Sequence, residues 1–262
     1  MITLEYYNDL SPESQVYGCF DLRMEERRFS DEGYATIAFD SATSMALASR
    51  RYSEYLNPKW RARPGSESGE KAYLKRYGAV TDYLEEALVT RVSGLQMNVV
   101  TLAHVAKEKN AINGEIVKHP AAPGRLADKG QMLASFYSEV YYAYVMKGQG
   151  GELLYCLQTQ NDGQMYAKSQ IQAPNPCFAE YGALWENWGP AARPPIHCLV
   201  YGDPGCGKTT FLTSFEPAGD VLVFYFDAMG MDMPYLRWAA ERGYTVKEDY
   251  DERNIRRVHL GA

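Results

Sequence analysis

Eight consecutive residues near the C-terminal end of the chain have the types and spacing that bind phosphate. They read Gly-Asp-Pro-Gly-Cys-Gly-Lys-Thr and match the full pattern G-x-x-x-x-G-K-[ST]. The glycines let the backbone wrap closely around phosphate oxygens, so that its N–H groups face them. We expect Lys208 to reach the β- and γ-phosphates and the Thr209 hydroxyl to ligate Mg²⁺. The predicted nucleotide-binding residues are Gly202, Asp203, Pro204, Gly205, Cys206, Gly207, Lys208, Thr209 and Thr210.

The residues around this loop are those that the motif requires. Residues 196–201 form a short apolar run that suits a buried strand, and residues 209–215 can begin a helix. A phosphate-binding loop needs a strand before it and a helix after it. The alternative, an ordinary glycine-rich turn, does not require this context, so a nucleotide site is the better interpretation.

Composition indicates an ordinary globular protein. The chain has 262 residues, 46% of them hydrophobic, and a net charge of -6, which suits one large α/β domain or two small ones. Because the net charge is negative, an argument for nucleic-acid binding needs local basic segments. Five scattered cysteines without a CxxC pair favour reduced thiols over a zinc site. We find no apolar run of membrane-spanning length and no signal peptide, and we expect a cytoplasmic protein, in the host cytoplasm if it is viral.

The elements that must position the loop can be placed from hydrophobic periodicity. Apolar residues at helical spacing predict helices at 14–29 and 70–92, whereas apolar runs predict buried strands at 34–39 and 97–103. A further buried strand at 221–226 follows the loop and leads into Asp227.

The stretch before the loop reads as a series of strands. Asn161, Asp162 and Gly163 predict a hairpin turn between the second strand and the third. Residues 189–195 contain three prolines and form a stiff connector. The three predicted strands span residues 139–146, 153–159 and 165–171.

If the chain is cut at residue 195 and the first piece is placed behind the second, its parts follow a familiar order. A phosphate loop is followed by a strand with an acidic end, a strand ending in Asp-Ser, a long helix, a strand ending in a polar residue, a loop and antiparallel strands. This order resembles the RecA/RadA recombinase core, and most closely the small phage-type RecA-like ATPases of single-strand annealing and recombination. The resemblance covers most of the chain.

The resemblance implies an α/β fold that is circularly permuted. It predicts a mostly parallel, twisted sheet with helices on both faces and an antiparallel extension over residues 139–171. Residues 1–262 would form a single domain, in which 1–188 hold the Walker B half, 189–195 the connector and 196–262 the Walker A half. ATP and Mg²⁺ are the implied ligands.

Three further site residues follow from the resemblance. Asp40, at the end of a predicted strand, matches the Walker B carboxylate that holds Mg²⁺, although a strand-ending Asp is also a common helix N-cap. His104 matches the γ-phosphate sensor, and a structural histidine is the alternative. Lys168 matches a lysine that a neighbouring subunit presents to the nucleotide, which implies a filament or ring; a solvated lysine is the alternative.

The chain departs from the family at the general base. The family's Glu, which orients the attacking water, falls on Met229 here. A carboxylate near the γ-phosphate is what the chemistry needs, so Asp227 or Asp232 is the candidate replacement. Otherwise hydrolysis would be slow and the protein would mainly bind nucleotide.

Two basic segments fall where the resemblance expects loops that contact single-stranded DNA, at residues 57–69 and 107–129. Cations around an aromatic ring suit phosphate contact combined with base stacking. The alternative is that these are ordinary solvated charges. The candidate DNA-binding residues are Lys59, Trp60, Arg61, Arg63, Lys107, Lys109, Lys118 and Arg125.

The function predicted from the sequence is Mg²⁺-dependent ATP hydrolysis coupled to single-stranded DNA in recombination, annealing or repair. A circularly permuted GTPase is an alternative, because Asp227 and Gly230 match a D-x-x-G element, but the guanine-selecting Asn/Thr-Lys-x-Asp element is absent. A nucleotide-binding regulatory module with little turnover is the third possibility.

Overall fold

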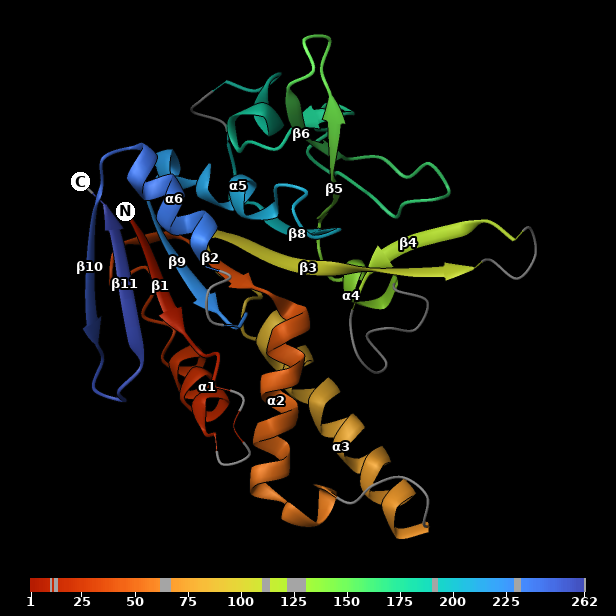
Figure 1. Ribbon diagram of the computed structural model, residues 1–262, viewed down its shortest axis with the longest axis vertical. Coiled ribbons are helices and arrows are strands. Elements are labelled where there is room, and N and C mark those ends of the chain that lie inside the picture. Colours follow the sequence, from red (N-terminus) through yellow and green to blue (C-terminus); the bar gives the residue numbers. More distant parts are fainter. Residues whose placement is uncertain are drawn as a thin grey trace.

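A single large sheet organises the molecule. The computed structural model describes residues 1–9, 11, 14–61, 67–109, 114–121, 131–189, 193–228 and 232–261. Within these residues the protein is a mixed α/β structure around an eleven-stranded sheet (Figure 1). Strands from both sides of the predicted connector at 189–195 belong to this sheet.

Six parallel strands form the centre of the sheet. Each pairs in parallel with the next, which confirms the prediction of a mostly parallel sheet. The predicted strands at 34–39, 97–103, 139–146, 196–201 and 221–226 are all among them. In spatial order they are β1 (Ile2–Tyr6), β9 (Asp220–Tyr225), β2 (Tyr34–Asp40), β3 (Asn98–Lys109), β8 (His197–Gly202) and β5 (Glu139–Lys147).

Antiparallel strands extend the sheet at both edges. Beyond β1 lie β11 (Arg256–Gly261) and then β10 (Thr245–Tyr250). Beyond β5 lie β6 (Leu153–Gln158) and β7 (Cys177–Phe178). β4 (Ile116–Pro120) pairs with the end of β3, and together they form a ribbon that projects from the body (Figure 1).

Helices cover both faces of the sheet, as the sequence predicted. The helices on one face are α1 (Val16–Glu26), α2 (Ala42–Leu56), α3 (Glu67–Glu85) and α4 (Gln131–Ser135), and those on the other are α5 (Lys208–Thr213) and α6 (Met233–Glu241). α2 and α3 run away from the sheet as a helical hairpin (Figure 1). Shorter turns are η1 (Pro58–Arg61), η4 (Gly182–Trp185) and η6 (Glu216–Ala218), and η2 (Glu86–Thr90) continues α3 as a π-helix.

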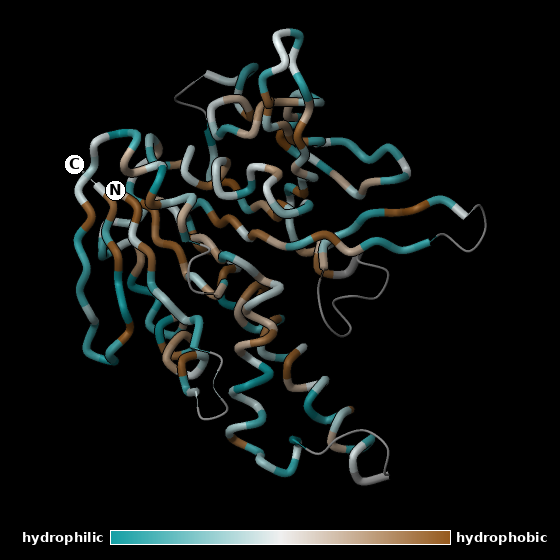
Figure 2. Tube along the Cα trace, viewed as in Figure 1, coloured by the Kyte–Doolittle hydropathy of each residue, from teal (hydrophilic) through white to brown (hydrophobic). Residues whose placement is uncertain are grey.

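Side chains along the central strands alternate between the two faces of the sheet, which explains the two hydrophobic clusters, one on each face. Ile37 and Phe39 belong to the cluster under α1 and α2, whereas Ala38 between them belongs to the cluster under α5 and α6. Successive side chains on a strand point to opposite faces, so a strand buried on both sides must be apolar throughout. Figure 2 shows the central strands as hydrophobic and much of β10 as hydrophilic, which agrees with the full exposure of that edge strand.

The predicted strand at 165–171 is wrong. Only two isolated bridges form there, between Lys118 and Met165 and between Val140 and Lys168. The Asp162 carboxylate accepts the backbone N–H groups of Gln164 and Met165, so a side chain satisfies donors that a hairpin would have paired. The antiparallel extension is made instead by β6 pairing with β5 and β7.

The polar segment that begins at residue 107 is partly a strand. β3 continues to Lys109 and pairs with β4, which places Lys107 directly opposite Lys118. The predicted strand at 97–103 was therefore too short. The extension carries charged residues because it leaves the core and is exposed to solvent.

Both chain ends lie side by side at one edge of the sheet (Figure 1). β1 pairs with β9 on one side and with β11 on the other, and Ile2 is opposite Leu260. The sequence reading did not predict β1, β10 or β11. Because β1, β11 and β10 lie beyond β9, the termini are found outside the pair formed by β9 and β2.

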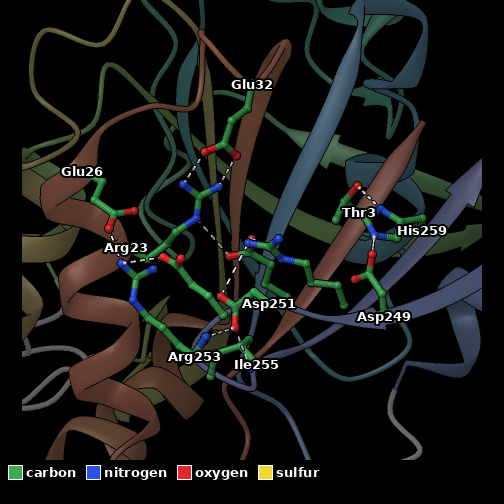
Figure 3. A network of polar contacts seen from close by, with 12 residues as sticks. Thr3, Arg23, Glu26, Glu32, Asp249, Asp251, Arg253, Ile255 and His259 are labelled. Atoms are coloured by element: carbon green, nitrogen blue, oxygen red, sulfur yellow. Dashed lines mark hydrogen bonds and ion pairs between the residues drawn. The ribbon is translucent and has the colours of Figure 1, made fainter.

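A network of buried ion pairs fastens these terminal strands (Figure 3). The carboxylate of Glu5 on β1 is 1% exposed and lies 3.4 Å from the Arg23 guanidinium of α1 and 3.0 Å from that of Arg257 on β11. Arg23 also pairs with Glu32. Because a buried charge is costly without partners, the network ties α1, β1 and β11 into one arrangement.

In the part of the chain that the structure describes, no helix is long and apolar enough to cross a membrane.

Candidate functional site

The carboxyl ends of four adjacent parallel strands meet at one edge of the sheet. β2 ends at Asp40, which is paired with Tyr225 near the end of β9, and His104 on β3 is paired with Gly202 at the end of β8. Ligands of open α/β sheets bind outside the carboxyl ends of the strands. The residues predicted to take part in chemistry therefore lie together at the carboxyl ends of the strands, where a ligand would be expected.

The glycine-rich loop leaves β8 and enters α5, which confirms the expected strand and helix. Gly205 and Gly207 have φ angles of 76° and 90°, in the region that favours glycine. A Cβ at Gly207 would lie 2.6 Å from the ring of Tyr155, and one at Gly202 would lie 2.4 Å from the Ala143 carbonyl oxygen. The loop packs so closely against β5 and β6 that side chains at these two positions would collide.

The Lys208 ammonium is turned back onto its own loop. It donates to the carbonyl oxygens of Gly202 at 2.9 Å and Asp203 at 3.1 Å, and lies 3.8 Å from Cys206 Sγ. All three partners are neutral acceptors, and in the part of the chain that the structure describes no carboxylate forms an ion pair with Lys208. Burial raises the pKa of the Cys206 thiol, although the charge of Lys208 opposes the shift, and the thiol stays protonated at neutral pH.

Two carboxylates lie at the ends of β2 and β9. Asp40 is buried, and its Oδ2 accepts a 2.6 Å hydrogen bond from the Tyr235 hydroxyl of α6. Asp227 Oδ1 accepts hydrogen bonds from the hydroxyls of Ser41, at 3.1 Å, and Ser44. Each carboxylate is thus held by hydroxyl donors from a neighbouring element.

Burial and proximity act strongly on Asp40. Burial, and then the charge of Asp227, raise the pKa of Asp40 to about 7, while the hydrogen bond from Tyr235 and the charge of Lys208 lower it. Lys208 and Asp40 come from distant parts of the sequence, yet their charges act on each other within one site. A nearby cation would therefore stabilise the charged form of the Asp40 carboxylate.

The donors present fit Mg²⁺ carried by a phosphate ligand. Mg²⁺ is usually held by one or two carboxylates, substrate phosphates and water, rather than by an all-protein cage. Asp40, Asp227 and the Thr209 hydroxyl offer oxygens of the right kind. Among the described residues no group of three or more His, Cys, Asp or Glu residues could hold a metal.

A cavity of about 880 Å³ opens beside the glycine-rich loop, between α5 and α6. Thr209 and Thr210 line its end near the loop, and the other walls include the acidic side chains of Glu180, Glu216 and Glu241 as well as aromatic and basic side chains. The latter are Tyr155, Tyr181, Arg193, Arg237, Trp238 and Arg242. Aromatic rings beside hydrogen-bonding groups are typical of pockets for drug-sized ligands.

A second cavity, of about 590 Å³, lies on the other side of the loop. Its walls include the loop residues Asp203 and Cys206 and the stacked rings of Tyr142 and Tyr144. Lys118 lies 4.8 Å from the centre of the Tyr142 ring and donates to its hydroxyl at 2.8 Å. This cavity connects the loop with the β3–β4 ribbon.

His104 and Lys168 have different relations to the site. His104 is half-buried beside Gly202, and its backbone N–H donates to the Thr43 hydroxyl at 3.1 Å. Lys168 bridges Val140 near the start of β5, and its ammonium donates to the Ser135 carbonyl oxygen at 3.4 Å. Within one chain, Lys168 is therefore apart from the carboxylates, and its role toward a neighbouring subunit stays a prediction.

The candidate DNA-binding residues lie on two separate projections (Figure 1). Lys59, Trp60 and Arg61 form η1, at the far end of the α2–α3 hairpin. The residues of the second group, Lys107, Lys109 and Lys118, share one face of the ribbon because opposite and next-but-one residues point the same way. Lys107 also pairs with Asp203 of the glycine-rich loop at 3.2 Å. Two of the candidates, Arg63 and Arg125, lie outside the described residues, as does Met229, on which the family's general base falls.

Sequence reasoning missed several residues that the fold brings to this edge. Tyr235 contacts Asp40, Ser44 contacts Asp227, and Tyr155 covers Gly207. In none of these pairs do the two residues belong to the same sequence motif. Asp232, the second candidate base, accepts a 2.7 Å hydrogen bond from the buried Tyr6 hydroxyl and is thus engaged with β1 rather than with Asp40.

Comparisons with protein-family models, with curated proteins and with solved structures found no match for this chain.

Proposed function

We propose that this chain is a circularly permuted RecA-like P-loop ATPase that binds ATP with Mg²⁺, hydrolyses it and acts with single-stranded DNA. The observation that carries the proposal is the gathering of Lys208, Asp40 and Asp227 at one edge of a single sheet. A full phosphate-loop motif, a buried carboxylate and a second carboxylate are the parts that phosphoryl transfer needs.

The glycine-rich loop would hold the phosphates. Its backbone conformation depends on glycine at positions 205 and 207, and a loop of this kind presents N–H groups to anions. The neutral acceptors that now hold the Lys208 ammonium are weaker partners than phosphate oxygens, because an anionic oxygen attracts the ammonium charge and a carbonyl oxygen carries no net charge. Binding would therefore draw the ammonium from its loop toward the β- and γ-phosphates.

The larger cavity gives room for the nucleoside. Thr209, the last residue of the phosphate motif, and its neighbour Thr210 are part of the cavity wall. A ligand whose phosphates sit in the loop can thus extend its base toward Tyr181 and Trp238, where aromatic rings offer stacking surfaces.

The carboxylates would divide the remaining work. Asp40 and the Thr209 hydroxyl are the proposed ligands of Mg²⁺, which when bound neutralises charge on the phosphates. Asp227, held by Ser41 and Ser44, would accept a hydrogen bond from the attacking water and orient it. His104, beside the first loop residue, would respond to the γ-phosphate.

The strand order supports the proposed permutation. β2 and β8 come from opposite ends of the chain and are separated by β3 alone. If the two pieces are exchanged at residues 189–195, the first strand of the reordered chain is the one that precedes the phosphate loop. The adjacency of the present termini is what such a rearrangement requires.

Single-stranded DNA is the proposed partner of the two basic projections. The ribbon is the better candidate, because Lys107, Lys109 and Lys118 lie on one face and Lys107 reaches the phosphate loop. Nucleotide phosphates in the loop would compete with the Asp203 carboxylate for the Lys107 ammonium and so affect the ribbon. A filament or ring, with Lys168 acting on a neighbour's nucleotide, belongs to the same proposal.

The test is a hydrolysis assay with ATP and with GTP, each titrated with single-stranded DNA. We expect Mg²⁺-dependent ATP hydrolysis that DNA stimulates. Preference for GTP would favour the permuted GTPase, and tight ATP binding without turnover would favour a regulatory module. The sequence gives a reason to expect the last result, because the family's general base falls on Met229.

Replacement of Lys208 by Ala should lower hydrolysis by about 100-fold or more, the range seen when one fixed donor to a developing charge is removed. Lys247→Ala is the matched control, because that exposed lysine lies on β10 at the edge of the sheet. Normal turnover by Lys208→Ala would remove the loop from the mechanism.

A further inference from the structure

Tyr235 makes a buried contact with the central carboxylate of the site. Its hydroxyl donates to Asp40 Oδ2 at 2.6 Å, although the two residues are 195 positions apart in the sequence. Tyr235 is fully buried and Asp40 is 6% exposed. The bond is short and shielded from water, as expected of a hydrogen bond to a charged acceptor.

This bond fixes how the carboxylate is turned. Rotation about the last bond of an Asp side chain is broad, so the carboxylate needs partners to hold one orientation. The negative charge of Asp227 acts on the same group and would favour turning it away. With Oδ2 held by Tyr235, the orientation of Oδ1 is determined as well.

The position of Tyr235 is itself well determined. Its ring packs edge-on against Tyr225, with centroids 6.2 Å apart and planes at 84°. Asp232, just before α6, accepts a 2.7 Å hydrogen bond from Tyr6 on β1. α6 is therefore anchored to the sheet at two points one turn apart.

The same helix forms a wall of the larger cavity. Pro234 and Trp238, on either side of Tyr235 along α6, line that cavity opposite Thr209 and Thr210. A ligand that fills the cavity must touch the helix that holds Asp40. α6 therefore contacts the cavity through Pro234 and Trp238 and contacts Asp40 through Tyr235.

We propose that Tyr235 is a positioning residue, whose hydroxyl orients Asp40 to receive the metal of a metal–nucleotide complex and links occupancy of the cavity to that orientation. This inference rests on the proposed function. Partners that orient metal-binding side chains commonly change metal affinity by about 10- to 100-fold when they are lost.

A neighbouring tyrosine argues against a merely structural bond. The hydroxyl of Tyr225 is buried and has no hydrogen-bond partner among the described residues. This layer of the protein therefore tolerates an unpaired phenol. The bond from Tyr235 to Asp40 is not explained by a general need to satisfy buried hydroxyls.

The test compares Tyr235→Phe with Tyr225→Phe, two variants that each lose one buried hydroxyl and keep the ring. Mn²⁺ serves as the probe, and its binding is followed by electron paramagnetic resonance with a non-hydrolysable ATP analogue present. We expect Tyr235→Phe to weaken Mn²⁺ binding by about 10-fold or more. Affinity for the analogue in EDTA should change less than twofold in both variants, and Tyr225→Phe should bind Mn²⁺ like the wild type.

A double variant tests whether Tyr235 acts through Asp40. Once Asp40→Asn is present, adding Tyr235→Phe should weaken Mn²⁺ binding no further, whereas independent effects would add. Removing both partners of a hydrogen bond destabilises a protein less than removing one partner. The double variant can therefore be measured in place of Tyr235→Phe if the single variant is too unstable.

The outcomes separate this inference from the proposed function. If the wild type binds Mn²⁺ with the analogue and Tyr235→Phe does so equally well, the positioning role is wrong and the proposed function stands. If both tyrosine variants weaken Mn²⁺ binding equally, the effect is structural and the role is also wrong. If the wild type binds neither the analogue nor Mn²⁺, both proposals fail.

Discussion

In the protein without ligands, few interactions stabilise the negative charge of Asp40. Its carboxylate is buried beside a second carboxylate, and the pKa of about 7 reflects the resulting cost of its negative charge. A buried carboxylate whose charge destabilises the fold is typical of sites where stability is exchanged for binding. A cation beside it would remove much of the cost.

Because the negative charge of Asp40 is costly in the folded protein, we predict that its stability depends on pH in the absence of nucleotide and Mg²⁺. The pKa of Asp40 is raised in the folded state above its ordinary value of about 3.9, so between about pH 4 and pH 7 the folded protein binds more protons than the unfolded one. The contribution of Asp40 to stability therefore falls as pH rises through this range.

Asp40→Asn should remove that dependence. We expect the variant to be more stable than the wild type at pH 8 by about 1–3 kcal/mol, with the difference shrinking toward pH 5. Thermal unfolding at both pH values measures it, with the exposed Asp249→Asn as control. A difference that is equal at the two pH values would mean that Asp40 does not titrate as described.

At the scale of elements, the glycine-rich loop is shaped by its packing as much as by its own sequence. Gly205 and Gly207 share the left-handed backbone conformation, but only Gly207 lies against another side chain, the ring of Tyr155 on β6. A comparison of substitutions at the two positions therefore distinguishes the cost of backbone strain from the cost of crowding.

Gly205→Ala and Gly207→Ala form a matched pair for this loop. Both should lose about 1–2 kcal/mol through the left-handed conformation, and Gly207→Ala should lose about 1–3 kcal/mol more through overpacking against Tyr155. Denaturant unfolding of both variants measures the difference. Equal losses would show that the ring of Tyr155 moves aside freely.

At the scale of the whole molecule, the two ends of the chain are joined by the sheet itself. The Met1 ammonium lies 2.8 Å from the Asp220 carboxylate, and Ile2 is paired with Leu260. The ion pair between Glu5 and Arg257 adds a further connection between β1 and β11. Because the ends are adjacent, a short linker can join them without unfolding either strand.

We therefore expect a relinked chain to fold. With Ala262 joined to Met1 through a short glycine-rich linker and new ends placed within residues 189–195, the melting temperature should stay within about 5 °C of the wild type, because surface breaks are tolerated. Binding of the ATP analogue should persist. A chain opened between Val100 and Thr101, both fully buried, is the control that should not fold. Failure of the first chain would contradict the proposed permutation.

The sequence by itself determined the parts that depend on local pattern. The phosphate-loop motif, the apolar runs of the central strands and the acidic ends at Asp40 and Asp227 were readable, because hydrophobic periodicity and fixed spacing act over a few residues. Those signals were sufficient for the α/β class and for the edge of the sheet where the site lies.

Tertiary structure alone decided which residues from distant segments touch. Tyr235 meets Asp40 across 195 positions, and Lys107 stands opposite Lys118 only because β3 continues into a ribbon. At residues 165–171 the apolar pattern suggested a strand, but the Asp162 side chain satisfied its first backbone donors instead. Such contacts depend on packing between elements, which no local pattern encodes.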